Sequence, residues 1–272
     1  MSITYSTQNT AVNGIRRMTK LVSYSSVPIT YNGSRRQFGS RTNTAVAFTA
    51  GGSANYSTAK SKFGAGSLDV ESAGKYISRA SYNVTSTGNG YPSGTGDFCI
   101  EGWMWMPTAR SSAAGATGVP ISLAATNGGL GVRFGTGYKS GTVNNLQIWG
   151  RGVLDGDYAA ITWPRDQWVH WAVQRRSATI SLWANGNKLT RTGGGNASTY
   201  SFSATTATLI MGNNDLLDEA TLSSFDEICV SNTWRYDDIN LTTYTPPTVA
   251  ITTDIYTNLL IHFDSDLTTA TT

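Results

Sequence analysis

Apolar and polar side chains alternate at every second residue in several stretches of this chain, and this pattern most constrains its fold. Residues 98–106, 168–175 and 178–184 all show the alternation. Asn185-Gly186 follows the last of them and predicts a hairpin turn, because both residues tolerate positive φ. No segment shows a helical period. The pattern therefore predicts an all-β protein, an antiparallel β-sandwich or jelly roll.

Composition agrees with a turn-rich β protein. The chain has 272 residues, enough for one large β domain. Charged residues make up 14%, below the roughly 25% of average domains, while Gly, Ser and Thr are abundant. A hydroxylated surface of this kind is typical of extracellular and particle-bound proteins.

The charge is unevenly distributed. The first 68 residues hold eight basic and no acidic groups, whereas the rest holds 12 basic and 17 acidic groups. Residues 1–42 also lack sustained alternation, so we expect a basic, extended N-terminal arm that docks on an acidic protein surface. A disordered terminus is the alternative. Nucleic acid is disfavoured as a partner, because the basic residues are sparse and lack interleaved aromatics. The candidate docking residues are Arg16, Arg17, Lys20, Arg35 and Arg36.

Residues 43–250 are expected to form the sandwich. Residues 245–248 (TPPT) mark the end of a structural unit, because proline cannot continue the interior of a sheet. Residues 251–272 then contain one more apolar strand, residues 258–264. This strand either closes the same sandwich or pairs with a neighbouring copy.

Five short motifs occur in a fixed order along the chain. They are residues 62–68 (KFGAGSL), 97–103 (DFCIEGW), 168–173 (WVHWAV), 182–186 (LWANG) and 225–230 (FDEICV). Together they resemble the laminin-G-like branch of the concanavalin A-like lectin/glucanase superfamily, over roughly residues 43–264. Gly102 departs from the large residue that is usual there. The resemblance implies a jelly-roll sandwich, a fold shared by lectins, hydrolases and assembly modules.

The residues argue against catalysis. The laminarinase-type relatives carry a Glu-x-Asp-x-(x)-Glu pattern on one strand, and no glutamate of this chain lies in such a pattern. Asp226 and Glu227 are adjacent, so alternation points them to opposite faces, whereas glycoside hydrolysis needs two carboxyls converging about 5–10 Å apart. Ser-His-Asp catalysis lacks a Gly-x-Ser-x-Gly turn. We expect no catalytic residue and no enzyme activity, with a glycoside hydrolase as the least favoured alternative.

Aromatic side chains are the candidates for glycan binding, because their faces stack on the apolar faces of sugar rings. The resemblance places Trp103 and Trp168 in the core. Trp105, Trp183 and Trp234 remain open as glycan-binding candidates.

The sequence predicts no cofactor apart from a candidate structural calcium. Calcium is a usual ligand of laminin-G and lectin relatives, and the loop acids that could hold it are Asp155, Asp157, Asp215 and Asp218. His170 and His262 have no accompanying Cys or His cluster, which argues against a transition metal. The resemblance sets Cys99 and Cys229 on neighbouring strands, as reduced thiols or a facultative disulfide.

Residues 57–64, Arg235-Tyr236 and 245–248 look similar to modules in phage capsid-decoration and tail-fibre proteins. This resemblance implies a non-enzymatic virion protein that is docked to capsid or tail proteins by its arm. It also implies a homo-oligomer. Host glycan binding is the alternative function. The chain start lacks a signal-peptide pattern and no apolar run reaches the roughly 18 residues of a membrane span. We therefore expect no membrane partner, synthesis in a host cytoplasm and a final location in the virion.

Overall fold

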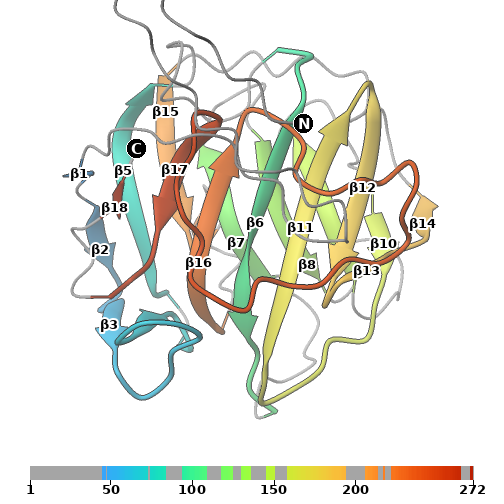
Figure 1. Cartoon of the computed structure of the whole chain (residues 1–272). Helices are drawn as coiled ribbons and strands as arrows, with labels where there is room; N and C mark the ends of the chain where they lie inside the picture. The colour runs from blue at the N-terminus through green and yellow to red at the C-terminus, as the bar shows by residue number, and fades with distance from the viewer. Residues whose placement is uncertain are drawn as a thin grey trace, which may run out of the picture.

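The computed structural model describes residues 45–46, 48–72, 74–83, 94–108, 118–124, 130–135, 145–150, 158–193, 206–213, 217, 222–264 and 270–271. In these segments all regular structure is β-strand, in two sheets whose paired strands are antiparallel (Figure 1). The predicted fold class, an all-β antiparallel sandwich, is confirmed. No helix in these segments is long and apolar enough to cross a membrane.

Sheet A lies at the front of Figure 1 and sheet B behind it. Sheet A follows the order β1 (Ala45–Val46), β18 (Ala270–Thr271), β17 (Thr257–Ile261), β16 (Ser224–Ser231), β6 (Phe98–Trp105), β11 (Trp168–Arg176), β12 (Thr179–Ala184) and β13 (Asn187–Lys188), with β4 (Ser67–Asp69) on β16 and β3 (Asn55–Ser57) on β4. Sheet B follows the order β14 (Arg191–Gly193), β10 (Tyr158–Ala160), β9 (Asn145–Gly150), β8 (Leu130–Gly135), β7 (Gly118–Ala124), β15 (Thr206–Met211), β5 (Tyr76–Asn83) and β2 (Thr49–Gly51).

The alternating residues of β6, β11 and β12 divide between two buried layers. One set packs into the main core; from β6 this set is Phe98, Ile100 and Met104. The other set points to the opposite face of sheet A, where alternation would place solvent-facing residues. On β6 this face carries Cys99 and Glu101, and both are fully buried. Something other than sheet B must therefore cover the outer face of sheet A.

The cover is the connection between β16 and β17, residues 232–256, which we call the strap. In Figure 1 it runs from orange to red in front of β6, β11 and β12 before it enters β17. Tyr236 and Tyr244 of the strap stack with ring centroids 3.9 Å apart and form a second apolar cluster with Trp183 and Cys99. The motif at residues 245–248 thus belongs to a packed segment over the sheet.

The strap is fastened by polar groups beneath it. Gln174 Oε1 accepts the backbone N–H of Arg235 (3.1 Å) and of Tyr236 (3.0 Å), and Gln174 Nε2 donates to Tyr236 O at 2.8 Å. Arg235 and Asp254 form an ion pair in which both side chains are fully buried. Thr257 Oγ1 donates to Asp254 Oδ1 at 2.9 Å, so the pair also fixes the start of β17.

The C-terminal strand belongs to sheet A of the same chain. β17 pairs antiparallel with β16, with Cys229 opposite Leu260, and inserts Leu259 and Ile261 into the main core. Of the two arrangements left open by the sequence, the structure has the strand in its own sandwich. The expected arm, residues 1–42, lies outside the described residues, and the domain boundaries remain predictions.

Cys99 and Cys229 lie on neighbouring strands, as the resemblance implies, and both are buried and not joined by a disulfide. They are not directly opposed, because Cys99 pairs with Ser231 and Cys229 pairs with Glu101. Diagonal neighbours of this kind are about 7–8 Å apart, too far for a disulfide without backbone movement.

We predict that Asp254→Ala lowers the free energy of unfolding by about 3–5 kcal/mol, because it leaves the Arg235 guanidinium buried without its carboxylate. Urea unfolding followed by tryptophan fluorescence measures this. Lys75→Ala is the matched control, because it removes one partner of the partly exposed Lys75–Asp69 pair and should cost about 1 kcal/mol or less. Equal costs for the two variants would contradict the anchoring role of Arg235–Asp254.

Candidate functional site

The acidic and histidine side chains at the centre of sheet A are sealed under the strap. Glu101 and His170 are fully buried. Tyr236 Oη donates to Glu101 Oε2, the ring nitrogen Nδ1 of His170 bonds Tyr244 Oη, and His170 Nε2 lies 3.6 Å from Glu101 Oε2. Burial raises the pKa of Tyr244 well above its ordinary value. This cluster holds the strap on the sheet, and no substrate reaches it in this structure.

The carboxylates of Asp226 and Glu227 are also buried, and both form hydrogen bonds with other segments of the chain. A bulge interrupts β16 between Asp226 and Cys229, and Glu227 has a φ of 55°. Asp226 Oδ2 accepts the backbone N–H of Lys62 (2.8 Å) and of Phe63 (3.2 Å). Burial raises the pKa of Asp226 to about 7, even though these hydrogen bonds oppose the rise.

Glu227 fastens the end of the strap to the C-terminal strand. Its Oε2 accepts the backbone N–H of Ile251, and its Oε1 lies 2.6 Å from His262 Nδ1. The hydrogen bond to Glu227 raises the pKa of His262. The two adjacent carboxylates therefore bind different backbone segments.

The KFGAGSL motif forms a loop held against sheet A. Besides the bonds to Asp226, the N–H of Ala65 donates to Asp264 Oδ1 at 3.0 Å. Gly64 has a φ of 61°, and a Cβ on it would lie 1.7 Å from Asp264 Oδ1, so glycine is required there. Leu68 is fully buried, whereas Phe63 is half-buried.

The open part of the outer face is at the end of β6 and the beginning of β11. Along β6 only Trp105, and along β11 only the terminal residues Trp168 and Arg176, are not buried. Trp105 and Trp168 are direct cross-strand partners with ring centroids 6.0 Å apart and an interplanar angle of 71°. We call this pair and the polar groups beside it the Trp105–Trp168 surface.

Polar groups lie near this surface. Lys60 Nζ lies 5.7 Å from the ring centroid of Trp105 and forms an ion pair with Glu71. Asp166 Oδ1 accepts the N–H of Thr108 at 3.0 Å, and hydrogen bonds from Thr108 lower the pKa of Asp166. Half-exposed aromatic rings beside hydrogen-bonding groups match a surface that binds an amphipathic ligand.

The tryptophans selected from the sequence have three different environments. Trp105 is half-buried at the open surface, as a glycan-binding candidate should be. Trp183 is fully buried and packs against both Tyr236 and Tyr244, so a sugar cannot stack on it and that assignment is corrected. The sequence could not reveal this, because it does not show that the strap covers the outer face.

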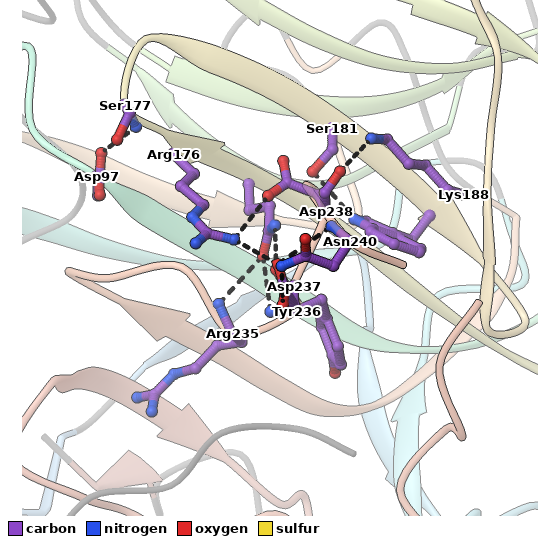
Figure 2. A network of polar contacts seen from close by, with 12 residues as sticks. Asp97, Arg176, Ser177, Ser181, Lys188, Arg235, Tyr236, Asp237, Asp238 and Asn240 are labelled. Carbon is purple, nitrogen blue, oxygen red and sulfur yellow. Dashed lines mark hydrogen bonds and ion pairs between the residues drawn. The ribbon is translucent and has the colours of Figure 1, made fainter. Parts of the chain in front are cut away.

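Trp234 is half-buried at the start of the strap. The guanidinium carbon of Arg176 lies 3.6 Å from its ring centroid, so one face is already occupied. Figure 2 shows the surrounding network, in which Arg176 Nη1 bonds Asp237 Oδ1 at 2.7 Å and Asn240 Nδ2 donates to Asp237 Oδ2 at 2.8 Å. The bond from Asn240, together with that from Arg176, lowers the pKa of Asp237 to about 2. This network makes Trp234 a weaker candidate than Trp105.

Sequence reasoning missed Trp168, which the resemblance had placed in the core, and the bordering residues Lys60 and Asp166. Trp103, expected in the core, is buried, but beneath the loop: it contacts Phe63 at 5.9 Å between ring centroids and lies under Lys62 Nζ at 4.0 Å. The pairing register of β6 with β11, which sets Trp105 opposite Trp168, was the signal that could have identified these two residues as neighbours.

Two groups of candidates lie outside the described residues. They are the docking residues Arg16, Arg17, Lys20, Arg35 and Arg36 and the calcium candidates Asp155, Asp157, Asp215 and Asp218. Where the structure describes the chain, no group of three or more His, Cys, Asp or Glu side chains could hold a metal ion.

Comparison with protein-family models finds no match, and comparison with curated protein sequences finds none either. Solved structures do match. Full-length tailspike protein 2 from Escherichia coli O157:H7 bacteriophage CAB120 has a TM-score of 0.51 at 10% identity, covering 84% of this chain and 31% of the tailspike. The enzymatically active domain of tailspike protein 2 from bacteriophage CBA120 has a TM-score of 0.50 at 10% identity, covering 83% of this chain and 34% of that one.

A Bacteroides ovatus ATCC 8483 protein named for carbohydrate binding is also similar, with a TM-score of 0.45 at 11% identity over 84% of this chain. This chain spans 58% of that protein, and about a third of the tailspike structures. At such low identity the likeness shows a shared β-sandwich fold and nothing finer. The concanavalin A/laminin-G assignment therefore remains a resemblance.

We predict a pH dependence of stability that Asp226→Asn removes. The pKa of Asp226 rises from 3.8 to about 7 on folding, so between these values the folded protein binds more protons than the unfolded chain. The free energy of unfolding therefore falls as pH rises through this window, by at most about 1.4 kcal/mol per pH unit.

Urea unfolding of both proteins at several pH values between about 4.5 and 6 measures the difference in slope. His262, whose raised pKa gives a loss in the same direction, contributes mainly above its unfolded value of 6.5. Identical slopes for the two proteins would show that Asp226 does not titrate in this window.

Proposed function

We propose that this chain is a non-enzymatic, glycan-binding module of a virus particle. The observation that carries the proposal is the Trp105–Trp168 surface, the part of β6 and β11 where aromatic rings on the outer face are partly exposed. Every residue of β6 before Trp105 is buried, so ligand contact on this strand is restricted to its end.

The surface has the chemistry that sugars require. A pyranose ring presents C–H groups on its faces and hydroxyls at its edge, so it pairs with an aromatic ring flanked by hydrogen-bonding groups. Trp105 and Trp168 supply the rings, and the Lys60–Glu71 and Asp166–Thr108 pairs supply donors and acceptors beside them.

The same geometry disfavours hydrolysis. A glycosidase needs an accessible acid and an accessible base or nucleophile on either side of the scissile bond. Glu101, Asp226 and Glu227 are all buried, and each is hydrogen-bonded to the strap or to the loop that precedes β4. We therefore propose binding without catalysis.

We predict that Trp105→Ala weakens glycan binding about tenfold, equivalent to about 1.4 kcal/mol, because it removes one stacking face. A panel of immobilised bacterial surface polysaccharides identifies a bound glycan, and calorimetry with its oligosaccharide compares the variants. Trp234→Ala is the control, because it removes a tryptophan beside Arg176, away from the proposed surface.

Both variants should keep the wild-type circular dichroism spectrum. The proposal is wrong if Trp105→Ala binds as tightly as the wild type, or if Trp234→Ala alone loses binding. Release of reducing sugar from the bound polysaccharide would overturn the non-enzymatic part.

The virion setting rests on the sequence. The basic residues of the predicted arm favour docking to an acidic particle surface, and residues 57–64, Arg235-Tyr236 and 245–248 look similar to phage decoration and tail-fibre modules. We infer that the partners are capsid or tail proteins, that the chain forms homo-oligomers, and that the sandwich presents its glycan-binding surface outward from the particle.

We predict that deletion of residues 1–42 leaves a folded sandwich that no longer binds the particle. Each exposed ion pair contributes only about 0.2–1 kcal/mol, so the five candidate basic residues would act together. Co-sedimentation of the truncated and full-length chains with particles lacking this protein measures occupancy. A truncated chain that still binds at full occupancy would contradict docking through the arm.

A further inference from the structure

A pocket of about 360 Å³ opens where β12 and β13 meet the strap. Ile180, Leu182 and Leu189 provide apolar lining, and Lys188 and Arg191 provide two cations. β13 is the last strand of sheet A and β14, which begins at Arg191, is the last strand of sheet B. The pocket therefore lies at one lateral edge of the sandwich, and none of its lining residues belongs to the Trp105–Trp168 surface.

The strap fixes the shape of the pocket. The N–H of Lys188 donates to Thr242 O at 2.8 Å, and the N–H of Tyr244 donates to Gly186 O at 2.7 Å. Thr242 therefore stays beside Lys188 and forms part of the pocket wall. Because these contacts are backbone hydrogen bonds, the wall does not depend on long, mobile side chains.

The polar groups favour a hydroxylated anion. No acidic side chain lines the pocket. Lys188 Nζ donates one hydrogen bond to Asp238 O at 2.6 Å, as Figure 2 shows, and an ammonium has three donors. Ser181 Oγ accepts the Nε1–H of Trp183 at 3.0 Å, which leaves its own hydroxyl hydrogen as a donor. Thr190 and Thr242 also line the pocket.

We propose that this edge pocket binds a carboxylate-bearing sugar residue, such as the uronic acid unit of an acidic polysaccharide. The carboxylate pairs with Lys188 and Arg191, the ring lies over the partly buried Leu189, and the ring hydroxyls bond the threonines. The volume lies within the roughly 300–1,000 Å³ of ligand pockets. The site goes beyond the proposed function, because it uses other residues and selects for charge.

The test uses the full chain and three small probes: D-glucuronate, D-glucose and D-glycerate. ¹⁵N-edited NMR titration should show glucuronate binding at about millimolar concentration, with shifts at residues 180–182, 188–191 and 242. Glucose and glycerate should bind at least about tenfold more weakly, since each lacks part of the recognised chemistry. Equal binding of glucose would overturn the role of the cations, and equal binding of glycerate would overturn recognition of a sugar ring.

Two variants test whether glucuronate binds at Lys188 and Arg191. Arg191→Gln and Lys188→Gln should each weaken glucuronate binding about tenfold, as expected for loss of a charge-assisted hydrogen bond. Glutamine at position 188 removes the positive charge and keeps an N–H donor. Lys75→Gln is the control, because Lys75 pairs with Asp69 away from the pocket.

Trp105→Ala separates this site from the proposed one, because glucuronate binding at the edge pocket should be unchanged in that variant. Loss of glucuronate binding in Trp105→Ala but not in Arg191→Gln would overturn the edge pocket. The absence of any chemical-shift change at residues 188–191 at about 20 mM glucuronate would also overturn the proposal.

Discussion

Fastening of the strap to the outer face of sheet A is the interaction on which the rest of the structure depends. Gln174 binds the backbone at Arg235 and Tyr236, and the buried Arg235–Asp254 pair joins the beginning of the strap to its end. A buried charge is tolerated only when it is paired and hydrogen-bonded. The pair therefore specifies one position for the strap, and the apolar contacts of Tyr236 and Tyr244 then seal the sheet beneath it.

The strap determines which residues can meet a ligand. It turns Trp183 and Glu101 from potential surface groups into interior ones. The strap leaves both proposed binding sites uncovered: the aromatic pair lies at the end of β6, and the cationic pocket lies beside β13, where Thr242 of the strap forms part of its wall. The fold is thus shared with other β-sandwich proteins, while the strap decides which side chains of this chain are accessible.

The acidic residues of β16 connect segments that are far apart in sequence. Asp226 binds the loop at Lys62 and Phe63, and Glu227 binds Ile251 and His262. Two adjacent carboxylates therefore join the N-terminal part of the sandwich to its C-terminal strand. The raised pKa of Asp226 is a consequence, because burial penalises its charged form more than the backbone hydrogen bonds favour it.

The sequence by itself determined the class of fold, because alternation with period two and turn residues such as Asn185-Gly186 act locally. That the carboxylates form no catalytic set stays a prediction from the sequence. The sequence did not determine which strand faces meet solvent, since that depends on residues 232–256 crossing β6, β11 and β12. Only the tertiary structure decided that Trp183 is buried, that Trp105 meets Trp168 and that Lys188 and Arg191 line one pocket. These contacts arise from packing between segments distant in the chain, which no local pattern encodes.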